Sequence, residues 1–231
     1  MDIGGIRDYS IAPRSSVKIA TPGTDPAIHV GSVLVMPAAG SKAPVASTVF
    51  SYVDRGVTVT ESGAPSTGVA QSFRLYAEYG GMRTGVAVVN TASTAADVQF
   101  ELLDLAGGAP GHSGSITLDA NGHRSLFIDE IPGFQNLPSS FRGVLLVYGN
   151  APISVLGLRG RVNERGEFLI STTPAIADNA ATTTEEMIFP HIVSGGGYTT
   201  EFLLMSRGAA SEGTVLLRSQ SGAELALPIA R

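Results

Sequence analysis

The stretch FRGVLLVYGNAPISVLGL, residues 141–158, decides the fold because it has a counterpart near the N-terminus. HVGSVLV at residues 29–35 matches its first part, and PVASTVF at residues 44–50 matches its last part. Each stretch holds two short apolar runs separated by small residues and a proline, which is typical of consecutive β-strands. The chain therefore contains a repeated β-module.

The repeat is complete only when the end of the chain is read on into its beginning. Residues 73–177 contain one uninterrupted copy. Residues 189–231 follow the first part of that copy, and residues 9–66 follow the remainder, with strands and turns in the same order. Half of a sandwich cannot bury its own core, so we predict that the two halves meet, within one molecule or between molecules.

We therefore predict an all-β protein of two Ig-like antiparallel β-sandwich modules, one continuous and one split between the C-terminal and N-terminal segments. The continuous one is residues 70–177, called the central module below. Residues 1–66, the N-segment, form the C-terminal half of the split module, and residues 187–231, the C-segment, form its N-terminal half. Short connectors rich in small and polar residues join them at residues 64–70 and 177–185.

The amino-acid composition supports the all-β class and excludes one kind of partner. The chain has 231 residues with 15% charged residues, 28 Gly and 13 Pro, a turn-rich balance without the Glu and Lys of long surface helices. The net charge is −5 and Lys and Arg do not cluster, which argues against nucleic acid as a partner. We expect no membrane span, and any export signal is expected outside this chain, because residues 1–7 lack an apolar region.

Glycine pairs predict where strands turn back. Asn121-Gly122 is the strongest hairpin signal, since both residues tolerate positive φ, and Arg165-Gly166 and Arg55-Gly56 are weaker ones. Residues 129–137 are expected to form a short helical turn that prolines keep short.

Candidate catalytic and metal-binding patterns are weak. GHSGS at residues 111–115 resembles a nucleophile elbow only in part, and a loop between strands is the preferred interpretation. The glycines at residues 195–197 predict a bulge or a turn entering a strand, because no helix follows to hold a phosphate. Neither Asp129-Glu130 nor Asp119 with Asn121 resembles a calcium loop. The histidines have no metal-ligand spacing: His29, His112, His123 and His191. We expect no enzyme activity, metal or cofactor.

Three arginines near the last hairpin of the central module alternate along one strand face. Arg159, Arg161 and Arg165 are expected to face solvent or to pair with Glu164 or Glu167. The alternative is a basic strip that recognises an acidic glycan or a neighbouring subunit.

Three sets of motifs carry a resemblance to a known family: FPHI at 189–192 with GGGYTT at 195–200, GLRGR at 157–161 with ERGEF at 164–168, and YSIAPRSS at 9–16. They resemble a β-sandwich repeat module found, often in tandem, toward the C-termini of large secreted proteins of environmental bacteria. The resemblance implies a β-sandwich fold and an extracellular or cell-surface setting, and it transfers no catalytic residues. In that family the half that begins Phe-Pro runs straight on into the half with Ala-Pro-Arg-Ser-Ser, which it does not do here.

We therefore expect a structural subunit of an extracellular filament or surface assembly, whose partner is another copy of itself. An odd number of strands would place the ends of the central module at opposite poles, where connectors of under ten residues reach too short a distance for closure within one chain. Head-to-tail exchange of halves, as in donor-strand complementation or domain swapping, would then build a homopolymer. The predicted assembly interface is Ile11, Val17, Ile19, Val33, Val35, Phe202, Leu204, Val215, Leu217, Leu225 and Leu227.

Two alternatives stay open at this stage. With an even number of strands the split module could close within one chain, which would give a monomeric two-sandwich extracellular module for adhesion or polysaccharide binding. Glycans or cell-surface components are the further candidate partners. The chain could also be a fragment of a longer array.

Overall fold

The computed structural model describes residues 5–179 and 185–227. The chain divides into two units, Met1–Gly31 and Ser32–Arg231. The middle of the connector predicted at residues 177–185 and the end of the last C-segment strand, from Pro228 onward, lie outside the described residues.

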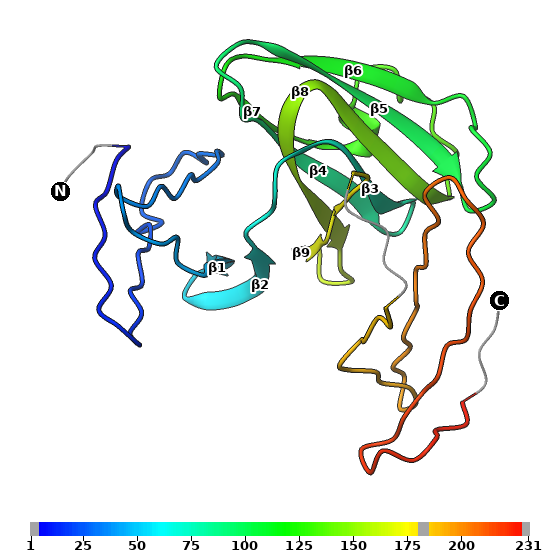
Figure 1. Ribbon diagram of the computed structural model, residues 1–231. Coiled ribbons are helices and arrows are strands. Elements are labelled where there is room, and N and C mark those ends of the chain that lie inside the picture. The colour runs from blue at the N-terminus through cyan, green and yellow to red at the C-terminus, as the bar shows by residue number, and fades with distance from the viewer. Residues whose placement is uncertain (1–4, 180–184, 228–231) are drawn as a thin grey trace. The chain divides into compact units, whose positions relative to one another are not determined.

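The fold is all-β with antiparallel pairing throughout the described ladders, which confirms the predicted class (Figure 1). The elements are β1 (Ser47–Asp54), β2 (Val57–Pro65), β3 (Ala70–Tyr79), β4 (Arg83–Asn90), β5 (Ala96–Asp104), β6 (Ser113–Leu118), β7 (His123–Phe127), the 3-10 turn η1 (Ile128–Glu130), β8 (Phe141–Val162), β9 (Phe168–Thr173) and β10 (Ile176–Ala177). The pair β1 and β2 forms a sheet of its own, and the strands from β3 to β10 form the other sheet.

The long strand β8 connects the two layers of the central module. Its first part pairs with β3 on one side and β5 on the other, and its last part pairs with β4 and β9. Figure 1 shows β8 bending between these parts. The sequence predicts two separate strands here, but the chain stays extended through Gly149 to Pro152, so one bent strand serves both layers.

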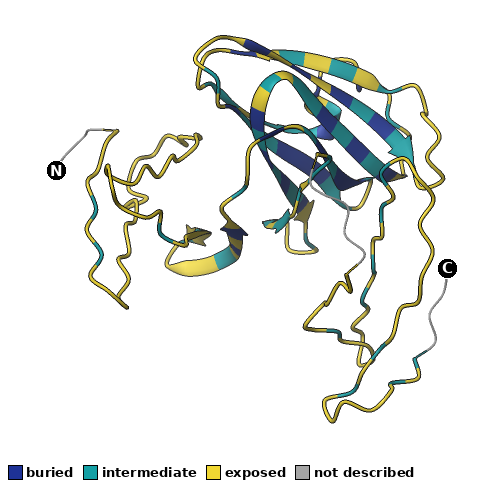
Figure 2. Ribbon diagram, viewed as in Figure 1, coloured by how far each residue is buried: buried dark blue, intermediate teal, exposed yellow. Residues whose placement is uncertain are grey.

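Alternation along the strands builds one hydrophobic core. On β5, Val98, Phe100 and Leu102 are fully buried while the residues between them are less buried, and on β8 the same holds for Leu145 and Val147. Three residues around and after η1 complete the core: Ile128, Ile131 and Phe134. Figure 2 shows the buried positions concentrated on the strands of the central module.

Two of the three predicted hairpins are confirmed. Arg165-Gly166 lies between the paired strands β8 and β9, and Arg55-Gly56 lies between β1 and β2. The hairpin predicted at Asn121-Gly122 is wrong, because β6 pairs with β5 while β7 pairs with β4. Asn121 does adopt a positive φ of 56°, but its turn carries the chain from one layer to the other. The expected helical turn is shorter than predicted and consists of η1.

Candidate functional site

The large apolar side chains of the N-segment and C-segment are mainly exposed (Figure 2). Of the predicted interface residues, six are exposed: Val17, Ile19, Val33, Val35, Leu204 and Val215. The others are half-buried: Ile11, Phe202, Leu217, Leu225 and Leu227. Single exposed apolar residues are normal on a protein surface, but long segments with this many mark an interaction surface.

The N-segment contains one ladder. β1 and β2 pair from Ser47 opposite Pro65 to Asp54 opposite Val57, whereas residues 5–46 form no strand. Val33 and Val45 in the strandless part are among its most exposed apolar residues. Sequence reasoning left Val45 out of the interface, although the match of Pro44 with Pro152 makes it the counterpart of Ile153, which is fully buried.

In the described part of the C-segment, residues 187–227, the backbone pairings are short and local. Tyr198 and Gly195 exchange two backbone hydrogen bonds of 3.1 Å, so the three glycines form a turn, but the strand predicted to follow it is not formed. Arg218 bridges Glu224 across a second turn. The described residues 185–227 contain no longer strand, so most of their backbone groups have no ladder partner in the chain.

The second of these turns has the geometry of the turn after β5. In the C-segment the Gly222 amide donates to the Ser219 carbonyl at 2.9 Å, and in the central module the Gly107 amide donates to the Asp104 carbonyl at 3.1 Å. The glycines have φ of 83° and 86°. Matching these turns pairs each C-segment position with the β5 position 115 residues earlier.

A threonine side chain makes a similar hydrogen bond in the central module and in the C-segment. The Thr84 hydroxyl accepts a hydrogen bond of 2.8 Å from the Glu78 amide, which links β4 to β3. In the C-segment the Thr200 hydroxyl accepts one of 3.2 Å from the Val193 amide and donates one of 2.7 Å to the Val193 carbonyl. Phe189 and Phe202 stack edge to face next to this contact, with ring centroids 5.5 Å apart.

β2 lies along the edge strand β9. The Thr60 hydroxyl donates to the Ile170 carbonyl at 3.1 Å and accepts from the Ile170 amide at 3.2 Å. The Thr172 hydroxyl donates to the Gly63 carbonyl at 2.6 Å. These side-chain bonds cover an edge that would otherwise present unpaired backbone groups.

The C-segment contacts the β3 side of the central module. The Arg207 guanidinium donates to the carbonyls of Ala177 and Asp178 at 3.3 and 3.0 Å. The Glu201 carboxylate lies 3.9 Å from the Arg142 guanidinium. Arg74 bonds the Ser206 carbonyl.

The two ends of the central module lie next to each other. β10 pairs with the start of β3, with Ala177 opposite Phe73, and the Asp178 amide donates to the Ser72 carbonyl at 2.9 Å. The structure therefore matches the even-number alternative rather than ends at opposite poles, because the sheet of the central module has eight strands, β3 to β10. The number is even because the single bent β8 takes the place of two separate strands. Connector length by itself does not prevent closure within one chain.

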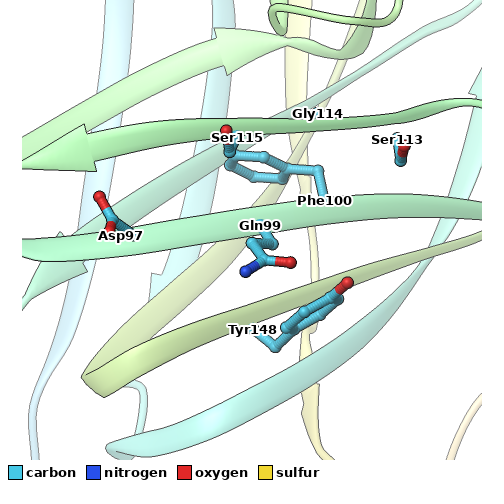
Figure 3. Close-up of a pocket in the computed structure, with 7 residues that line it drawn as sticks. All are labelled: Asp97, Gln99, Phe100, Ser113, Gly114, Ser115 and Tyr148. Atoms are coloured by element: carbon cyan, nitrogen blue, oxygen red, sulfur yellow. The ribbon is translucent and has the colours of Figure 1, made fainter.

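The predicted loop at the serine motif is correct only for Gly111 and His112, because the rest of the motif is the start of β6 and does not form an elbow. Ser113 and Ser115 belong to β6 and, with Asp97 and Gln99 of β5, line an open depression of about 340 Å³ (Figure 3). A Cβ at Gly114 would lie 1.9 Å from the Pro132 carbonyl, so this glycine allows the loop after η1 to approach β6. Within the described residues neither serine hydrogen-bonds to a histidine.

The three arginines near the last hairpin of the central module form ion pairs. Arg161 and Arg165 contact Glu164 at 3.7 Å and Glu167 at 2.7 Å, as predicted. Arg159 instead donates to Glu78 at 2.8 Å, a partner on β3 that spacing could not indicate.

Two of the carboxylates weighed as calcium ligands, Asp129 and Glu130, pair with Arg83. Both oxygens of Asp129 accept from Arg83, at 2.9 and 2.8 Å. In residues 5–179 and 185–227 no group of three or more His, Cys, Asp and Glu side chains gathers to hold a metal ion. Burial lowers the pKa of His123.

Comparisons with known proteins add little. No family model matches the chain, and no curated protein matches it. A crystal structure of Thermotoga maritima 1070 aligns with a TM-score of 0.36 and 12% identity, over 46% of this chain and 93% of that one. Among the described residues, no helix has the length and apolar character to cross a membrane.

Proposed function

We propose that this protein is a structural subunit of an extracellular filament or surface assembly, which polymerises head-to-tail when the C-segment of one copy and the N-segment of the next complete one β-sandwich. Its activity is assembly, in place of catalysis. The extracellular setting rests on the family resemblance of the sequence motifs.

The pattern of ladders carries this proposal. Some ladders of the central module join a strand that matches the C-segment to a strand that matches the N-segment. These are the ladders of β3, β5 and β4 with β8, and of β4 with β7. The pairings internal to one segment are β5 with β6 and β8 with β9. The described residues of the two segments contain ladders within one segment, namely the bridge at Arg218 and the hairpin of β1 and β2. They contain no ladder between the two segments.

The apolar side chains supply the driving force. Full burial of a Val, Leu or Ile side chain stabilises by about 1.5–3 kcal/mol, so the predicted interface would contribute on the order of 10 kcal/mol or more before the entropic cost of ordering. Strand addition would also give ladder partners to backbone groups of the described segment residues that lie outside any ladder. A joint of this kind is stable enough to hold subunits together.

One observation favours a second candidate, a monomeric two-sandwich module that closes on itself. The chain enters and leaves the central module at neighbouring positions, Phe73 and Ala177, so both segments start from the same edge. Such a monomer would leave its sandwich surfaces for adhesion or polysaccharide binding.

Electron microscopy and size-exclusion chromatography of the full chain, over a range of concentrations, separate the two. The proposal predicts filaments or a concentration-dependent series of oligomers. A monomer of 23.8 kDa at every concentration would overturn it in favour of the second candidate. Deleting residues 187–231 should abolish polymerisation while the central module stays folded.

A further inference from the structure

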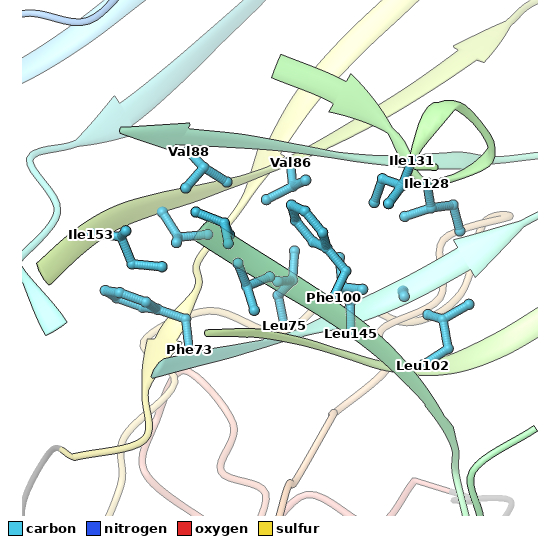
Figure 4. Packing of buried hydrophobic residues seen from close by; sticks show 14 of the residues in the cluster. Phe73, Leu75, Val86, Val88, Phe100, Leu102, Ile128, Ile131, Leu145 and Ile153 are labelled. Atoms are coloured by element: carbon cyan, nitrogen blue, oxygen red, sulfur yellow. The ribbon is translucent and has the colours of Figure 1, made fainter. Parts of the chain in front are cut away.

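The first part of β8 is the central strand of its layer. It has β3 on one side and β5 on the other, and on the β5 side Leu145 lies opposite Leu102 and Val147 lies opposite Phe100. All four side chains are fully buried. Figure 4 shows Phe100, Leu102 and Leu145 within the packed core.

The internal repeat gives each of these residues a counterpart. Matching FRGVLLV at 141–147 with HVGSVLV at 29–35 pairs Leu145 with Val33 and Val147 with Val35. Matching the turns at Gly107 and Gly222 pairs Phe100 with Val215 and Leu102 with Leu217. Val33 is 84% exposed, whereas Leu145 is 0% exposed.

We propose that the split module closes in one register, in which residues 29–36 insert between residues 214–218 and residues 189–193 of a second copy. Val35 then lies opposite Val215, and Val33 lies opposite Leu217. The register follows from the central module, and it rests on the proposed function only for the identification of the second strand as part of another chain. A slip of one residue would turn every one of these side chains to the wrong face.

Gly31 supports this register by the space that the position needs. It aligns with Gly143, where a Cβ would lie 2.0 Å from the Leu103 carbonyl oxygen of the neighbouring strand. A Cβ at Gly31 meets nothing within 4 Å in the described chain, and its φ is not positive. A glycine is therefore required at this position only when a strand lies beside it, at the carbonyl of Arg218.

Disulfide trapping tests the register, because the chain has no cysteine of its own. Directly opposite residues in an antiparallel pair have the Cα separation that a disulfide needs. The full-length double variant Val35→Cys with Val215→Cys should give a series of covalent multimers on oxidation. The matched control, Val35→Cys with Leu216→Cys, places one cysteine on the opposite face and should cross-link at least about tenfold less.

The outcomes separate the register from the proposed function. Cross-links inside a single chain at positions 35 and 215 would keep the register and overturn assembly between chains. Filaments whose cross-links favour positions 35 and 216, or in which neither pair cross-links, would overturn the register and leave assembly standing. A protein that neither assembles nor cross-links would overturn both.

A second variant avoids cysteine altogether. Gly31→Ala should raise the concentration needed for assembly by about tenfold or more, because the added methyl group overlaps a backbone oxygen. Gly68→Ala, at a position where a Cβ also meets nothing within 4 Å, should assemble like the unmodified chain. Equal assembly of Gly31→Ala and Gly68→Ala would contradict the register.

Discussion

Arg14 and Asn121, which the predicted repeat matches with each other, adopt the same left-handed turn. Their φ angles are 64° and 56°, which few residues other than glycine adopt. In each turn the amide of the next residue donates to the carbonyl three residues earlier, Ser15 to Ala12 at 3.1 Å and Gly122 to Asp119 at 2.8 Å. This part of the N-segment therefore has the local turn of its central-module match, although residues 5–46 form no strand.

Substituting a β-branched residue at these turns should separate stability from assembly. Asn121→Val should lower the free energy of unfolding of the central module by about 1–2 kcal/mol, because a left-handed conformation crowds a branched side chain. Arg14→Val should leave that free energy unchanged and weaken assembly. Urea denaturation measures the first quantity and sedimentation the second. A loss of central-module stability in Arg14→Val would contradict the separation.

A charge at the predicted core face of the N-segment should block assembly. Val33→Asp places a carboxylate where the counterpart Leu145 is fully buried, so the completed module could not form. Val30→Asp is the matched control, because its counterpart Arg142 has a side chain that is 56% exposed. Light scattering should show polymers for Val30→Asp and none for Val33→Asp. Thermal unfolding of the central module should be the same in both variants. Polymers of Val33→Asp together with no polymers of Val30→Asp would exclude Val33 from the interface.

The ion pairs of Glu78 should contribute to the stability of the central module. Its carboxylate lies 2.8 Å from Arg159 and 3.5 Å from Arg142, with only 16% of the side chain exposed. We expect Glu78→Gln to cost about 1–3 kcal/mol, since Arg159 loses its charged partner and Arg142 loses the nearer of its two, the other being Glu201. Glu164→Gln, which removes the exposed partner of Arg161, should cost less than about 0.5 kcal/mol. If urea denaturation shows equal losses of unfolding free energy for the two variants, the burial of Glu78 does not determine the strength of its ion pairs.

Stability should fall in mild acid because of His123. Burial lowers the pKa of its imidazole below the usual 6.5, so the unfolded chain binds the proton at a higher pH than the folded one. The free energy of unfolding therefore decreases as the pH drops below about 6.5, the unfolded value. Urea midpoints at pH 7.5 and 5.5 should differ less in His123→Gln than in the unmodified protein. The control His191→Gln, in the C-segment, should show the same difference between the two urea midpoints as the unmodified protein. A smaller difference in this control would contradict the assignment of the effect to His123.

The hairpins show how far short-range signals predicted the fold. Arg55-Gly56 and Arg165-Gly166 join strands that pair directly, so the turn and the ladder agree. At Asn121-Gly122 the turn geometry was predicted and the strand pairing was not, because each flanking strand finds a partner in its own layer. Local φ preferences specify a turn, whereas the choice of partner depends on which faces must be buried.

The candidate surface was predicted unevenly for a similar reason. Alternation selected Val33 and Val35, whose exposure the structure describes, but the pattern does not distinguish Val45 from a loop residue after Pro44. The pairing of Arg159 with Glu78 joins residues on β8 and β3 that only the folded sheet brings together. Contacts between distant strands depend on register, which no short window of sequence contains.

The sequence by itself determined the all-β class and most turn positions, and it is the source of the hypothesis that one repeat is divided between the two ends of the chain. Periodicity and glycine positions are local properties, so a turn can form whether or not the flanking strands pair. Only the tertiary structure decided that β8 bends to serve two layers and that Phe73 and Ala177 bring the ends of the central module together. Those features arise from long-range burial, because a strand takes the neighbours that cover its apolar face.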